Sequence, residues 1–133
     1  LEHESAPAAI AVEPEGFDDT GRSLLRGERL RNEPDARSIC DALLAPTPGQ
    51  LTFALNSQLG TSGLAVSDQA VRTAMAFALR HLKLVVEPGG AVGLAALLSG
   101  LLPTEGRPFV VVLSGGNVDA ARLGEILQEA ELQ

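Results

Sequence analysis

The sequence predicts an α/β protein in which a parallel sheet is flanked by helices. Short apolar runs at 10–12, 84–86 and 109–112 are typical of buried strands. They alternate with segments at 67–82 and 118–127, in which apolar residues recur at helical spacing. This alternation favours parallel pairing, because a parallel connection needs a crossover that a helix supplies.

Composition limits the classes of protein to consider. The 133 residues fit one ordinary domain, and 45% of them are apolar, as in a globular protein. Seventeen acidic against ten basic residues give a net charge of −7, with no basic block and few aromatic residues, so we expect no nucleic-acid partner. No apolar stretch reaches the roughly 20 residues of a membrane span, and no signal peptide is evident. We therefore expect a cytoplasmic protein with no membrane partner.

The amino-terminal half contains fewer regular elements. We interpret residues 1–8 as a tail or a cut connection, and residues 9–133 as a single α/β domain. The strand at 10–12 precedes a short helix within 20–31, which is weakened by Gly27. A proline-rich segment, 32–52, is expected to be mostly loop.

The second half is more strongly patterned. The segment LTFAL at 51–55 fits either a strand or one helical turn. Ser67 is a good N-cap for a helix that runs to about Leu82. After the strand at 84–86, the segment 91–98 is apolar almost all round, which predicts a buried helix.

The turn Ser114-Gly115-Gly116-Asn117 is the first candidate site. It follows the apolar run at 109–112, and open α/β sheets bind ligands at the carboxyl ends of their strands. Glycines allow close approach of backbone N–H groups, and a helix beginning near Asn117 would place its positive end there. An ordinary strand-to-helix turn explains the same residues equally well.

Two further stretches carry carboxylates. The segment 13–19, EPEGFDD, holds four of them, which suits a hard cation, although a solvated loop that caps the next helix fits as well. Glu87 lies between an apolar strand and an apolar helix, so it is either a partnered site residue or an exposed turn residue.

In order and spacing, these stretches resemble the pyridoxal-phosphate enzymes of fold type II, in particular the serine/threonine dehydratases and serine racemases. The resemblance is carried by VEPEGFDDTGRSLLRG, SICDAL, VSDQAVRTAM, HLKLVVEPGGAVGLAALLSG and VVVLSGGNVD. It implies that the chain is the carboxyl-terminal part of such an enzyme. The fold would then be part of a three-layer parallel sheet flanked by helices, as in the tryptophan synthase β-like large domain.

The resemblance implies a role for each stretch. Ser114 would hydrogen-bond the pyridine nitrogen of pyridoxal phosphate, next to Gly115, Gly116 and Asn117, and Glu87 would line the edge of the cofactor. In a separate site, a Mg²⁺ or Ca²⁺ ion would be held by Glu13, the main-chain carbonyl of Phe17, and Asp19. Serine racemases also bind a nucleotide effector with residues that match Lys83 and Asn117.

The family's catalytic lysine and its glycine-rich phosphate loop lie in an amino-terminal part that has no counterpart in these 133 residues. Lys83 is the only lysine, and the family places this position away from the Schiff base. We therefore expect no catalytic residue in this chain, no activity by itself, and an amino-terminal half as its partner.

Three functions remain open. The first is part of a dehydratase that removes water from threonine or serine, giving a 2-oxo acid and ammonia. The second is part of a racemase acting on serine or hydroxyaspartate. The third is a non-catalytic domain whose exposed sheet edge pairs with another copy, and a homo-oligomer is expected in any case.

Overall fold

The computed structural model describes residues 8–102, 106 and 108–131. The tail predicted at 1–8 therefore lies outside the described residues, except for Ala8. The described elements, in chain order, are β1 (Ile10–Pro14), α1 (Asp19–Arg26), the 3₁₀ turn η1 (Asp41–Leu43), α2 (Gln50–Gln58), β2 (Ser62–Val66), α3 (Asp68–Phe77), the π-helical turn η2 (Ala78–Leu82), α4 (Pro88–Leu98) and α5 (Ala120–Glu131).

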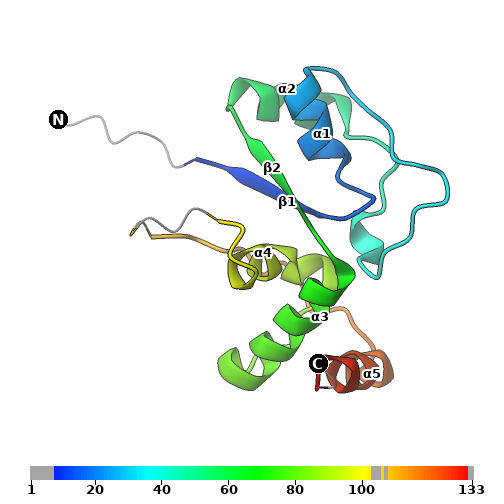
Figure 1. Ribbon diagram of the computed structural model, residues 1–133, viewed down its shortest axis with the longest axis vertical. Coiled ribbons are helices and arrows are strands. Elements are labelled where there is room, and N and C mark those ends of the chain that lie inside the picture. Colours follow the sequence, from blue (N-terminus) through cyan, green and yellow to red (C-terminus); the bar gives the residue numbers. More distant parts are fainter. Residues whose placement is uncertain (1–7, 103–105, 107, 132–133) are drawn as a thin grey trace.

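The sheet of the described residues consists of β1 and β2, which pair in parallel from Ile10 opposite Ser62 to Pro14 opposite Val66. Figure 1 shows a layered arrangement, with α1 and α2 on one side of the strands and α4 on the other. Beyond α4, α3 packs against both α4 and α5. The predicted parallel α/β architecture is confirmed.

Local sequence explains most helix boundaries. The Ser67 hydroxyl caps α3 by accepting a hydrogen bond from Ala70 N at 3.2 Å, as predicted. Helix α1 ends at Gly27, whose φ of 75° is left-handed and whose N–H bonds Ser23 O at 2.9 Å. Pro88 occupies the first turn of α4, where its missing N–H costs nothing.

The core lies between the carboxyl-terminal helices and the sheet. Its fully buried members include Met75 of α3, Ile126 of α5 and Val66 of β2. Helix α4 is buried over most of its length, as its apolar sequence predicts, although Leu98 at its end is exposed.

Several predictions about strands were wrong. Strand β2 was not predicted, although Leu64 to Val66 is a short apolar run directly before the Ser67 cap. The segments 84–86 and 109–112 do not form strands, since the sheet of the described residues contains only β1 and β2. Of the residues predicted to be buried there, Val110 is 93% and Val112 is 72% exposed, because no element of the described residues covers that side.

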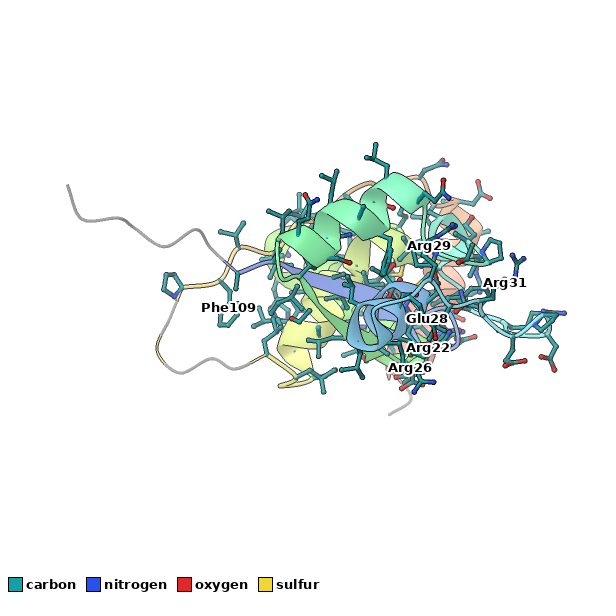
Figure 2. All side chains as sticks on the ribbon, turned by 90° about the horizontal axis from the view of Figure 1, so that it is seen from above. Arg22, Arg26, Glu28, Arg29, Arg31 and Phe109 are labelled. Atoms are coloured by element: carbon teal, nitrogen blue, oxygen red, sulfur yellow. The ribbon has the colours of Figure 1, made fainter. Side chains whose placement is uncertain are left out.

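One alternative that the sequence left open is decided, and one helix prediction needs correction. LTFAL forms part of a helix, α2, rather than a strand. Helix α1 is shorter than 20–31, so Arg29 and Arg31 belong to the loop that follows it. These arginines nevertheless gather with Arg22 and Arg26 on one side of the molecule, away from Phe109 (Figure 2).

Candidate functional site

The turn Ser114–Asn117 follows an extended segment, 109–113, whose residues alternate in burial. Phe109, Val111 and Leu113 pack against the core, and the residues between them face outward. Val111 lies against Gly93 of α4, since a Cβ on that glycine would be 3.2 Å from Val111 Cγ1. The segment thus delivers Ser114, which is exposed, beside the start of α4.

Both glycines of the turn are required by their surroundings. Gly115 has φ +136°, and a Cβ there would lie 2.6 Å from Oε1 of Glu87. A Cβ on Gly116 would lie 2.7 Å from the carbonyl oxygen of Val85. The backbone oxygen next to Gly116 cannot move aside, and the positive φ of Gly115 strains any other residue, so both positions favour glycine.

Glu87 contacts this turn directly. Its backbone N–H donates to Gly115 O at 3.0 Å, and its Oε2 accepts from the backbone N–H of Asn117 at 3.0 Å. The structure therefore brings together Glu87 and the four turn residues, which the sequence had placed in separate stretches. Of the two interpretations of Glu87, the structure favours the partnered carboxylate over the exposed turn residue without a partner.

The prediction of a helix beginning near Asn117 was wrong. Helix α5 begins at Ala120, because Val118 N–H bonds Gly116 O and keeps the chain in a turn. The helix start that adjoins the turn is that of α4, where a Cβ on Gly90 would lie 3.1 Å from Gly115 O. The positive end of a helix dipole thus borders the site, but it comes from α4.

A second loop meets the same helix start. Residues 38–40 are anchored by Asp68 of α3, whose Oδ1 accepts from Ser38 Oγ at 2.6 Å and whose Oδ2 accepts from Ile39 N at 3.1 Å. The sequence gives no signal of this role, because Asp68 lies about 30 residues from the loop. A cleft of about 330 Å³ separates this loop from the turn and is lined by Ser38, Ile39, Asp41, Pro88, Asn117, Val118, Asp119 and Arg122.

The acidic stretch has a different environment. Glu13 accepts hydrogen bonds from the N–H groups of Thr20 at 3.0 Å and Gly21 at 2.9 Å, so it caps the start of α1. Burial raises the pKa of the Glu13 carboxyl. Asp19 is buried and accepts from Asn32 Nδ2 at 2.5 Å, and Phe17 is buried beside it in sequence. The structure thus favours the capping interpretation for Glu13.

No group of three or more His, Cys, Asp and Glu side chains converges on a possible metal position within residues 8–102, 106 and 108–131. The predicted set contains two carboxylates and one carbonyl, so the cation remains a prediction. Another cleft, of about 450 Å³, lies between α1 and β2 and is lined in part by Asp18, Arg22 and Leu25. Sequence reasoning did not anticipate it.

Comparison with known proteins shows the family to which the chain belongs. The family model described as "Pyridoxal-phosphate dependent enzyme" matches residues 1–115, which include the extended segment and the first half of the turn. The chain belongs to this family of pyridoxal-phosphate-dependent enzymes. In the described part of this family member, no helix is long and apolar enough to cross a membrane.

The similar proteins include an ammonia-lyase and serine racemases. The chain is 34% identical to L-threonine ammonia-lyase of Thermotoga maritima over 122 residues, covering 90% of this chain and 29% of the relative. It is 35% identical to serine racemase of Dictyostelium discoideum over 121 residues, which is 89% of this chain and 37% of the relative. The chain thus spans about a third of the length of the curated relatives it matches.

Solved structures agree with this family. A threonine deaminase from T.th. superimposes with a TM-score of 0.77 at 37% identity, covering 84% of this chain and 37% of that one. Maize serine racemase superimposes with a TM-score of 0.77 at 34% identity, and the match covers 92% of this chain and 38% of the racemase chain. These neighbours have the fold type II architecture, so the predicted fold class is confirmed.

The residues of the turn fit one edge of the family's cofactor. Ser114 offers an exposed, neutral hydroxyl, which can pair with a pyridine nitrogen. The missing side chains of the two glycines leave room for the Glu87 carboxylate and the Val85 carbonyl, while the turn itself stays exposed. Lys83, the only lysine, lies at the end of η2, where its Nζ donates to Arg80 O at 2.7 Å.

Proposed function

We propose that this chain is the carboxyl-terminal part of a threonine/serine dehydratase and forms one wall of its pyridoxal-phosphate site. The observation that carries the proposal is the turn itself: an exposed Ser114 at the end of an extended segment, with Gly115 and Asn117 held by Glu87. The enzyme would convert a hydroxy amino acid to a 2-oxo acid and ammonia. The proposal agrees with the similarity to an L-threonine ammonia-lyase and a threonine deaminase.

When bound, pyridoxal phosphate supplies an electron sink for the bond-breaking steps at the amino acid. Ser114 would hold the ring by a hydrogen bond to its nitrogen. A neutral hydroxyl leaves that nitrogen less protonated than a carboxylate would, which suits elimination of water better than transamination. The catalytic lysine and the phosphate loop would come from the amino-terminal part, so we expect this chain alone to be inactive.

The exposed face of segment 109–113 supports an amino-terminal partner. Val110 and Val112 are 93% and 72% exposed, while the alternate side chains pack on the core. Leu84 and Val85, which precede Glu87, are about half exposed, at 47% and 49%. Extended chain that is apolar on both sides is typical of a strand inside an α/β sheet. We therefore propose that the amino-terminal part covers this face.

The decisive experiment uses a longer version of the protein that carries its amino-terminal part. Given threonine or serine, it should release a 2-oxo acid and ammonia, and Ser114→Ala should lower the rate by roughly 10-fold or more through loss of one hydrogen bond. Ser99→Ala, at the exposed end of α4, is the matched control and should keep the rate. If neither threonine nor serine yields a 2-oxo acid, the dehydratase assignment is refuted.

Racemisation of serine or hydroxyaspartate is the second candidate, because serine racemases are among the relatives of similar identity. The same residues would serve both reactions. Chiral analysis of the amino acid that remains in the assay separates them: inversion without 2-oxo acid supports the racemase, and 2-oxo acid without inversion supports the dehydratase.

The third candidate is a non-catalytic domain that self-associates through the exposed edge. Light scattering on this chain tests it, and a monomer that binds no hydrophobic dye would contradict it. A visible absorption band after addition of pyridoxal phosphate, fixed by borohydride onto Lys83, would instead contradict our proposal that the lysine lies elsewhere.

Other expectations from the sequence remain predictions. A cation held by Glu13, Phe17 O and Asp19 should raise the melting temperature when Mg²⁺ or Ca²⁺ is added, and Glu13→Gln should abolish the increase. A nucleotide effector at Lys83 and Asn117, a homo-oligomer, a cytoplasmic location and a single domain over 9–133 are likewise untested.

A further inference from the structure

Glu87 stands in an unusual position for a residue that begins a helix. It is the N-cap of α4, with extended backbone at φ −73° and ψ 161°. An N-cap Ser, Thr, Asp or Asn ordinarily accepts a hydrogen bond from one of the first backbone N–H groups of its own helix, which stabilises the helix by about 1 kcal/mol. The Glu87 side chain makes no such bond. The Glu87 carboxylate is therefore not used at the start of α4.

The Glu87 carboxylate is directed instead to a turn 30 residues further along the chain. Its Oε2 accepts from the backbone N–H of Asn117 at 3.0 Å, while the Glu87 backbone N–H donates to Gly115 O at 3.0 Å. The other carboxylate oxygen lies against Gly115, where a Cβ would be 2.6 Å away. Three contacts from one residue thus fix the two ends of the segment 115–117.

Ser114 directly precedes this segment, so its direction depends on how the segment is held. The side chains of the turn add little packing, since all four residues from Ser114 to Asn117 are exposed, although its main chain lies close to Val85 O and Gly90. Exposed turns of small residues are otherwise among the first parts of a protein to open locally. Hydrogen bonds from Glu87 supply the order that packing does not.

We infer that Glu87 is a positioning residue for Ser114: it holds the main chain of 115–117 so that the Ser114 hydroxyl keeps one direction. The sequence-based expectation that Glu87 lines the cofactor's edge stays a prediction beside this role, since the Asn117 N–H engages only Oε2 of the carboxylate. The identity of the ligand that Ser114 meets rests on the function proposed above. We call the two hydrogen bonds between Glu87 and residues 115–117 the clamp. The clamp can be measured without that ligand.

Amide hydrogen exchange of this chain, followed by NMR, tests the inference. In Glu87→Ala, the Asn117 amide should exchange roughly 10-fold faster or more, as expected for loss of a hydrogen bond to a charged group. The backbone chemical shifts of Ser114 and Gly115 should also move. Amides of the α3 core, from Val71 to Met75, should exchange as in the unmodified chain, which shows that the fold is intact.

Two further variants separate positioning from a general structural role. Glu87→Gln keeps an acceptor oxygen, so it should restore most of the protection at Asn117 and the shifts of Ser114. Glu125→Ala removes an exposed carboxylate that pairs with Arg122 at 3.1 Å within α5. It should leave the exchange rate of the Asn117 amide and the chemical shifts of Ser114 unchanged.

Equal exchange at Asn117 in the unmodified chain and in Glu87→Ala would overturn the inference. So would faster exchange confined to the first turn of α4, since that pattern shows a helix cap. Neither result bears on whether pyridoxal phosphate binds, because no cofactor is present in the experiment. The clamp and the proposed function can therefore fail separately.

Discussion

Gly63 of β2 lies directly against Gly21 of α1. A Cβ on Gly21 would be 3.2 Å from Gly63 Cα, and a Cβ on Gly63 would overlap Gly21 Cα itself. The same Gly21 donates its N–H to Glu13 of β1 at 2.9 Å. The contact between two glycines thus sets how closely α1 approaches both strands.

Replacement of Gly63 by alanine should destabilise the protein. The added methyl group meets backbone rather than a movable side chain, so we expect a loss of about 1–3 kcal/mol in the free energy of unfolding. Urea denaturation measures it. Gly124→Ala, in α5 with open space around the added Cβ, is the control and should stabilise by about 0.5–1 kcal/mol. Equal effects of the two substitutions would contradict the close packing.

Loss of the Asp68 carboxylate should release the loop at 38–40. Asp68→Ala removes the bonds from Ser38 Oγ and Ile39 N, and we expect a loss of roughly 2–3 kcal/mol. The Cys40 thiol, which is fully buried at the end of this loop, should then react faster with a thiol reagent. Asp35→Ala changes an exposed carboxylate that does not act on the Cys40 thiol, and it should leave the labelling rate near that of the unmodified chain.

The pH dependence of stability should reveal the buried thiol. Burial raises the pKa of Cys40 from 9.0 to about 11. Since the unfolded chain ionises first, it binds fewer protons than the folded chain, so stability falls as pH rises from about 9 through about 11. The measurement is the free energy of unfolding across this range. In Cys40→Ala the free energy of unfolding should decline less over this pH range. An equal slope in both proteins would refute Cys40 as the source of the decline.

Lys83 carries backbone strain that can be relieved. Among the residues described, it is the one non-glycine residue with positive φ, at 60°. A left-handed conformation costs an ordinary residue roughly 1–2 kcal/mol, and glycine avoids this cost but loses more entropy on folding. We expect Lys83→Gly to raise the free energy of unfolding by about 0.5–1 kcal/mol in thermal or urea denaturation. Lys83→Ala keeps the strain and should not stabilise; a gain equal to that of glycine would show that φ is not the cause.

Local pattern was enough where a feature depends on neighbouring residues in the chain. The Ser67 cap of α3, the burial of α4 and the need for glycine at 115 and 116 could all be predicted, because capping, apolar content and turn chemistry act over a few residues. The ordered motifs also indicated the family, which the comparisons confirm.

By itself, then, the sequence determined the α/β class, the family and the turn that carries Ser114. Only the tertiary structure decided that Glu87 faces this turn, that Asp68 anchors the loop at 38–40, and that β1 pairs with β2. It also decided that Val110 and Val112 are exposed. The reason is physical. A hydrogen bond between residues 30 positions apart depends on which elements pack together in space, and so does the burial of a strand. The local pattern of the sequence does not specify this packing.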